Sequence, residues 1–175
     1  MRRKYLKDFR PDGSGRYVYR GSVFVYADDN ALPRRAAIGR LWLFGAVLFA
    51  AAVLQGCLPE DGMLNCAYVL VPYCGEVISA GSVLWALVQL GRARDGVREY
   101  DYNVSVSALP RRALLSLLFA AAALAGESVY LAVRGVRTVL FTAALFFLLL
   151  LACTAAFLLR RFVLTLRWEQ RIPSD

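Results

Sequence analysis

The chain has 175 residues, of which 59% are hydrophobic and 19% are charged, and its formal net charge at neutral pH is +8. The mean hydropathy of +0.50 excludes an ordinary soluble domain and indicates an integral membrane protein. Because the basic residues lie beside apolar runs, we interpret the charge as a topology signal and expect no nucleic-acid binding.

Residues 1–35 form a polar and basic segment, and we expect no signal peptide because a short apolar core with a cleavage pattern is missing. Within it, the alternating stretch "YVYRGSVFVY" at 17–26 favours two strands joined by a turn at Arg20-Gly21. We therefore expect a cytoplasmic β-hairpin here. The alternative is a surface ribbon whose tyrosines anchor in the lipid headgroups.

Four apolar stretches follow, each long enough to cross about 30 Å of hydrocarbon as a helix with a rise of about 1.5 Å per residue. The expected fold is an all-α membrane protein with two transmembrane hairpins at 36–91 and 111–160. An outer loop at 57–68 divides the first hairpin, a cytoplasmic connector at 92–110 joins the two, and 161–175 is a cytoplasmic tail. The predicted spans are Leu41–Leu58, Val69–Leu90, Ala113–Val133 and Thr138–Leu159.

Basic residues gather before the first span, between the second and third, and after the fourth, whereas the other two loops contain few. Lys and Arg beside spans are retained on the cytoplasmic side during insertion, so we expect both termini in the cytoplasm. The preference for Arg and Ala is typical of a GC-rich bacterial genome. The predicted location is therefore the bacterial cytoplasmic membrane.

The pentapeptide "ALPRR" occurs at 31–35 and 108–112, each time directly before an apolar run. Asn30 and Ser107 precede the two copies and favour helix N-caps, with proline in the first turn. Arginines at this level reach lipid phosphates with their long side chains. The residues expected to contact anionic lipid headgroups are Arg34, Arg35, Arg111 and Arg112.

The surroundings of the two copies also match, which favours an internal repeat. Before the second copy, "REYDYNVSVS" at 98–107 alternates like the first stretch, with Tyr100, Tyr102, Val104 and Val106 on one face of an expected strand. After each copy comes an Ala-rich span, a short outer connection and a second span. We therefore predict two hairpins related by a parallel repeat about the membrane normal.

Small residues at four-residue spacing predict how the helices pack. Such faces let helix backbones approach closely, because lipid provides no hydrophobic force that drives helices together. The predicted packing faces are Ala46/Ala50 in the first span and Ala122/Gly126 in the third.

Polar residues inside the spans give a candidate site. Counted from the basic residues at the inner ends of their spans, Gln55, Glu76 and Glu127 lie roughly 22 to 24 Å deep by helical rise, which predicts one shared level. Tyr73 and Tyr130, each three residues from a glutamate, add hydroxyl groups. Two close carboxylates should share a proton at neutral pH. The alternative is that both glutamates reach the outer water or pair with Arg134 and Arg137.

The cysteines support a second hypothesis. Cys57, Cys66 and Cys74 lie at or near the outer loop, and we expect a disulfide between Cys57 and Cys66. Redox catalysis is disfavoured because the chain has no CxxC motif and no histidine. The same lack of ligands predicts no metal site, and no sequence motif indicates a cofactor.

These observations favour a non-catalytic interaction or accessory subunit over an enzyme. The alternative is a small transporter or ion-conducting protein that uses Glu76 and Glu127, expected as a homodimer because four helices enclose little volume. A membrane thiol redox protein is the third hypothesis. The expected partners are the lipid bilayer and either a second copy or another membrane protein.

Overall fold

The computed structural model describes residues 9–11, 17–19, 21–59, 66–93, 96–135 and 138–171. Its four longest helices are each long and apolar enough to cross a membrane, so the chain is a multi-pass membrane protein, as predicted. These helices are α1 (Arg34–Gln55), α3 (Ala67–Arg92), α5 (Leu109–Arg134) and α6 (Val139–Thr165).

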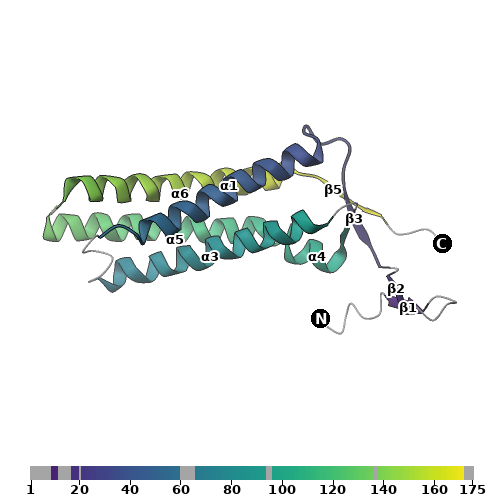
Figure 1. Cartoon of the computed structure of the whole chain (residues 1–175), viewed down its shortest axis with the longest axis horizontal. Coiled ribbons are helices and arrows are strands. Elements are labelled where there is room, and N and C mark those ends of the chain that lie inside the picture. The colour runs from purple at the N-terminus through teal and green to yellow at the C-terminus, as the bar shows by residue number, and fades with distance from the viewer. Residues whose placement is uncertain are drawn as a thin grey trace.

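The four helices form one elongated bundle in which each helix runs antiparallel to the next along the chain (Figure 1). Helix α1 packs against α3 and α6, and α5 packs against the same two helices. Alanine and leucine side chains fill the interior, among them Leu48, Ala52, Ala80, Leu87, Ala120 and Leu159. We call the end where α1 and α5 begin the sheet end, and the end where they finish the loop end.

A three-stranded antiparallel sheet lies at the sheet end, beyond the helices (Figure 1). Strand β3 (Val23–Tyr26) is central, between β4 (Val97–Arg98) and β5 (Trp168–Arg171). Four aromatic rings fasten this sheet to the short helix α4 (Glu99–Val104), because Tyr102 of α4 stacks on Phe24 at a centroid distance of 3.9 Å and also meets Trp168. Tyr26 contacts the same tryptophan edge to face.

The predicted strand pairing is wrong. Strand β2 (Tyr17–Tyr19) pairs with β1 (Phe9–Pro11), whereas β3 pairs with β4 and β5. The strands at 17–19 and 23–26 therefore do not form a hairpin with each other, and Arg20 of the predicted turn lies outside the described residues. The segment 1–35 contains strands, but their partners are not the neighbours that local alternation suggested.

The second predicted strand, at 98–107, is also wrong for most of its length. Only Val97–Arg98 is a strand, and Glu99–Val104 is helix α4. The alternation of Tyr100, Tyr102, Val104 and Val106 is not used by a sheet, because β4 pairs with β3 through two residues and the chain then turns into a helix. From that helix, the ring of Tyr102 still reaches the sheet.

The two ALPRR segments begin helices, but the predicted caps are wrong. Pro33 is the N-cap of α1 and Ala108 is the N-cap of α5, and neither helix has a side-chain cap. Asn30 instead joins two loops: its side-chain nitrogen donates to the carbonyls of Ala27 and Arg167, and its oxygen accepts from the Arg167 backbone N–H at 2.9 Å.

The predicted packing faces are only partly correct. Ala46, Ala50 and Ala122 are exposed, so these positions face away from the bundle. Gly126 does lie at a helix contact, since a Cβ built there would be 2.7 Å from the backbone oxygen of Tyr68 on α3. Four-residue spacing identified small residues in the spans but not the side of each helix that faces its neighbours.

Candidate functional site

Three polar side chains from three different helices are completely buried near the loop end of the bundle. Gln55, Glu76 and Glu127, on α1, α3 and α5, are each 0% exposed. The amide nitrogen of Gln55 donates a hydrogen bond of 3.0 Å to Oε1 of Glu76. Because both glutamates are buried, the alternative in which they reach the outer water is wrong.

The two glutamates do not share one level. The hydroxyl groups of Ser116 on α5 and Ser79 on α3 are 2.9 Å apart, so these residues are level with each other. From that pair, Glu76 lies three residues nearer the loop end and Glu127 lies eleven residues nearer it. Their Cα atoms are therefore offset by about 12 Å along the bundle.

The prediction of a shared level failed because the basic residues used as references are not level. Arg112 Nη1, on α5, donates to the carbonyl of Ser82 on α3 at 2.8 Å. Arg112 is therefore level with a point well before the C-terminal end of α3. Arg92, the other reference, belongs to the last turn of that helix. The offset between Arg92 and Arg112 carries over to the two glutamates.

Side-chain direction reduces the offset between the two carboxyl groups. In a helix the Cα–Cβ bonds tilt toward the N-terminus, which is at the loop end for α3 and at the sheet end for α5. Glu76 therefore extends toward the loop end and Glu127 toward the sheet end. Gln55 links the two, since its amide donates to Glu76 and it lines a cavity together with Glu127.

A small cavity lies beside Gln55 and Glu127. Its volume is about 10 Å³, and it is lined by Gln55, Tyr73 and Glu127 together with the apolar side chains of Val69, Ala123, Leu145 and Leu149. This volume is at the lower limit of what one water molecule needs. Tyr130, the other predicted member, packs against the buried cluster of Val69, Ala123, Leu145 and Leu149.

Two oxygen atoms in this site have no hydrogen-bond partner among the described residues. They are Oε1 of Gln55 and Oε2 of Glu76, and both are buried. Buried polar atoms normally find a partner, because leaving one unsatisfied costs about 1–3 kcal/mol. Oε1 of Gln55 is an acceptor, whereas Oε2 of Glu76 accepts when the carboxyl group is ionised and can donate when it is protonated.

A polar track continues from Glu76 toward the sheet end along the contact between α3 and α5. Ser116 Oγ donates to Ser79 Oγ, and Ser79 Oγ donates to the backbone carbonyl of Glu76 at 2.9 Å. Sequence reasoning missed both serines. Their spacing gave a usable signal, since Ser79 is three residues from Glu76 and Ser116 is four from Arg112, which places each pair on one helical face.

The four arginines predicted to contact lipid divide into two pairs. Arg34 donates to the carbonyl of Ala93, and Arg112 lies 5.4 Å from the ring centre of Trp85, in addition to its bond with Ser82. These two are held within the protein. Arg35 and Arg111 are exposed, and their contact with anionic lipid headgroups stays a prediction.

The predicted disulfide is not formed. All four cysteines are free thiols, and Cys57 Sγ lies 3.6 Å from the carbonyl of Val53 one turn earlier. That contact directs the Cys57 thiol back along α1, rather than across the outer loop to Cys66. Nothing in the described part of the chain favours thiol redox chemistry.

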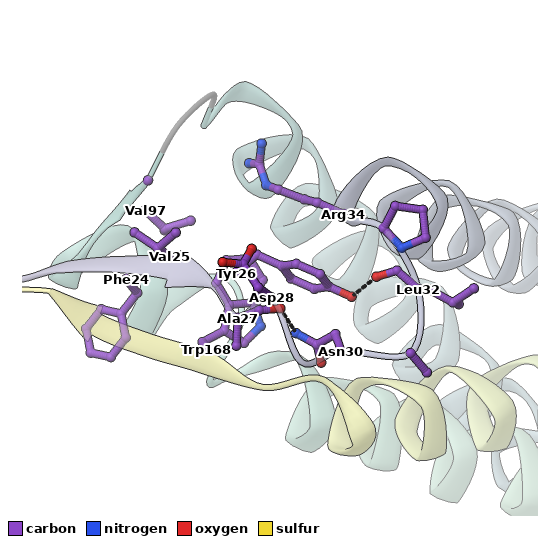
Figure 2. A pocket seen from close by; sticks show the side chains of 13 residues that line it. Phe24, Val25, Tyr26, Ala27, Asp28, Asn30, Leu32, Arg34, Val97 and Trp168 are labelled. Atoms are coloured by element: carbon purple, nitrogen blue, oxygen red, sulfur yellow. Dashed lines mark hydrogen bonds between the residues drawn. The ribbon is translucent and has the colours of Figure 1, made fainter.

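A second and larger pocket lies at the sheet end (Figure 2). Its volume is about 590 Å³, within the usual range for ligand pockets of about 300–1,000 Å³. Strand β3, the loop that leads to α1, and β5 supply its lining, which includes Tyr26, Asp28, Ala31, Arg34 and Trp168.

Hydrogen bonds hold the lining of this pocket in place. The hydroxyl of Tyr26 donates to the carbonyl of Leu32 at 2.9 Å, which fixes the loop against the strand. Trp168 has a buried indole N–H without a partner among the described residues. Sequence patterns did not indicate this pocket, because β5 contributes to it from beyond the fourth span. No family model, curated protein or solved structure matches the chain.

Proposed function

We propose that this chain is a non-catalytic membrane subunit that binds a partner protein at its sheet end. The observation that supports the proposal is the contrast between the two cavities. The sheet-end pocket of about 590 Å³ is open to side chains of another molecule, whereas the cavity inside the bundle measures only about 10 Å³. A cavity of that size admits no organic substrate.

The sheet itself supplies a second reason. Among the described residues, β5 pairs only with β3, so its other edge presents backbone N–H and C=O groups. An unpaired edge is the usual place for an extended segment of another protein to add a strand. Glu169, Gln170 and Arg171 are exposed along β5 and are available to select that segment.

We place the sheet end in the cytoplasm, with the protein in the bacterial cytoplasmic membrane and both termini inside. The support is the gathering of basic residues at the sheet ends of all four helices, against Arg134 alone among the described basic residues at the loop end. In a background with all four native cysteines replaced by serine, a membrane-impermeant thiol reagent should label Pro59→Cys in intact cells and should leave Asp28→Cys unlabelled. The reverse pattern would invert the orientation.

We also retain the internal repeat as a proposal. Both ALPRR segments precede helices that run from the sheet end to the loop end, which is the relation expected for a parallel repeat of two hairpins. The copies differ locally, because proline is the N-cap of α1 but lies inside the first turn of α5.

A pair of matched substitutions tests partner binding. Ala31, in the loop before α1, and Ala36, in the first turn of α1, are both exposed, but only Ala31 lines the pocket. Ala31→Trp should fill the pocket and abolish recovery of a stoichiometric partner after crosslinking in native membranes, while Ala36→Trp should leave it unchanged. Equal recovery with both variants would contradict the proposal.

The buried glutamates support a second candidate, a small transporter or ion-conducting protein that works as a homodimer. Intramembrane carboxyl groups commonly carry protons or ions. If that function is correct, Glu76→Gln or Glu127→Gln should abolish proton or cation flux into reconstituted vesicles, because the amide keeps the size but loses the titratable charge. Absence of flux with the wild-type protein under every ion gradient would exclude this candidate.

A further inference from the structure

We propose that the outer edge of β5 binds an antiparallel extended segment of the partner protein, in which an acidic residue is followed two positions later by a basic one. This proposal rests on the proposed function and specifies the kind of segment that the sheet end binds. Its support comes from the direction of the backbone groups of β5, from the two charged side chains beside them, and from the direction in which the strand runs.

Backbone hydrogen bonds on both sides of the central strand β3 show how its residues point. The N–H of Ala27, directly after β3, donates to the carbonyl of Arg167, directly before β5, at 3.2 Å. On the other side of β3, the N–H of Glu99 donates to the carbonyl of Ser22 at 3.1 Å. Successive residues of an antiparallel strand point both backbone groups to alternate sides. Every second residue of β3, counted back from Ala27, therefore points toward β5.

The register carries this alternation over to β5. Glu169 lies opposite Val25, which points toward β5, so the backbone groups of Glu169 point toward β3. Its neighbours Trp168 and Gln170 therefore point their N–H and C=O groups outward, away from β3. Among the described residues, no strand pairs with β5 on that side. An antiparallel segment added there can exchange a pair of hydrogen bonds with Gln170.

Two side chains of opposite charge flank Gln170 on one face of the sheet. The side chains of Glu169 and Arg171 are 59% and 62% exposed, and their closest charged atoms are 3.9 Å apart, so they bind each other only weakly. The ring of Trp168 lies on the other face, where it meets Tyr102 of α4. Helix α4 therefore leaves the two charged side chains accessible to an added strand.

These charges select the order of residues in the added segment. We infer the antiparallel direction because both neighbours of β3 already pair with it in that sense, and antiparallel pairs are slightly more stable. The segment residue before the one opposite Gln170 then lies opposite Arg171, and the residue after it lies opposite Glu169. Opposite charges directly across a strand pair are stabilising, and like charges are destabilising. The favoured order is therefore acidic first and basic last.

The direction of β5 favours a different protein over a second copy as the occupant of this edge. Strand β5 runs away from the helical bundle (Figure 1). An antiparallel β5 of another copy would run toward this bundle, so the bundle of that copy would lie beyond the sheet on the opposite side. Two copies in one membrane have their bundles side by side. The edge therefore suits a segment of another protein that approaches the membrane surface.

Two short synthetic peptides of identical composition test the order of charges. Their centres are Glu-Thr-Lys and Lys-Thr-Glu between the same flanking residues, and binding to the full chain in detergent is measured by fluorescence anisotropy. The first peptide should bind at least about tenfold more tightly, because the second replaces two cross-strand attractions with two repulsions. Glu169→Arg combined with Arg171→Glu keeps the net charge and should reverse the preference.

Methylation of the peptide backbone tests which groups of β5 point outward. The N–H of the central threonine would donate to the carbonyl of Gln170, so N-methylation at this position should abolish binding. The N–H of the next residue, lysine, would point away from β5. N-methylation of the lysine is therefore the matched control and should leave binding in place.

The results that would overturn the proposal come from the wild-type protein, so they do not depend on a variant that folds. They are equal affinity for the two peptides, no binding of either, or a dimer of the full chain that the Glu-Thr-Lys peptide dissociates. Partner recovery that is lost with Ala31→Trp, without any selectivity between the peptides, would contradict this proposal alone. Peptide selectivity with partner recovery unaffected by Ala31→Trp would instead contradict the proposed function alone.

Discussion

The close approach of α5 to α3 makes the stability of the bundle sensitive to a single methyl group at Gly126. A Cβ at this position would lie 2.7 Å from the backbone oxygen of Tyr68, which is shorter than any normal contact. A backbone atom cannot swing aside as a side chain does, so Gly126→Ala must push the two helices apart. We expect an overpacking cost of about 1–3 kcal/mol.

Gly39 provides a matched control. It also lies inside a helix, α1, and a Cβ there would meet nothing within 4 Å. Both substitutions gain the helix propensity of alanine, about 1 kcal/mol in water, so this gain cancels when the variants are compared. The difference in free energy of unfolding between Gly126→Ala and Gly39→Ala should therefore equal the packing cost alone.

The measurement is unfolding in mixed micelles as the fraction of sodium dodecyl sulfate is raised, followed by the fluorescence of the three tryptophans. Gly126→Ala should unfold at a lower fraction of sodium dodecyl sulfate than Gly39→Ala. A difference below about 0.5 kcal/mol, the range of ordinary surface substitutions, would refute the close contact between α3 and α5.

Three other predictions concern the sheet end and the thiols. Asn30→Ala should lower stability by about 2 kcal/mol because three hydrogen bonds are lost, whereas Asp29→Ala should change it by less than about 1 kcal/mol because its ion pair is exposed; thermal melts compare the two. Burial raises the pKa of Tyr26, so the stabilisation from its neutral hydroxyl should persist below the unfolded pKa of about 10 and disappear as pH rises through the folded value. Alkaline titration of stability should lose this component in Tyr26→Phe. Cys57 and Cys66 should both react with iodoacetamide without prior reduction, and recovery of a disulfide-linked peptide would contradict the structure.

The four spans could be predicted because burial in lipid depends on the hydropathy of a contiguous segment. Each of the observed helices contains most of its predicted apolar run, and each extends past it at the sheet end. The polar residues of the candidate site were predicted for a similar reason, since Gln55, Glu76 and Glu127 stand out against apolar neighbours. Their burial follows from the cost of exposing them to lipid.

The predictions that failed concern features that depend on contacts between distant segments of the chain. The pairing of β3 with β5 joins residues on either side of all four spans, and no local alternation encodes it. The offset between Glu76 and Glu127 arises from how far α3 extends past the beginning of α5, which helix length alone does not determine. The same limit applies to the prediction for Tyr102, because a tyrosine that packs against Phe24 and Trp168 can belong either to a strand or to a helix.

The positions of the strands in the sequence determine the order in which the sheet can form during biosynthesis. Strand β3 leaves the ribosome before any span, whereas β5 follows the fourth span. About 70 residues separate β4 from β5, or roughly 4–14 s of translation at about 5–20 residues per second. Throughout that interval one edge of β3 lacks its partner strand β5. The sheet can therefore be completed only after the fourth span has been synthesised.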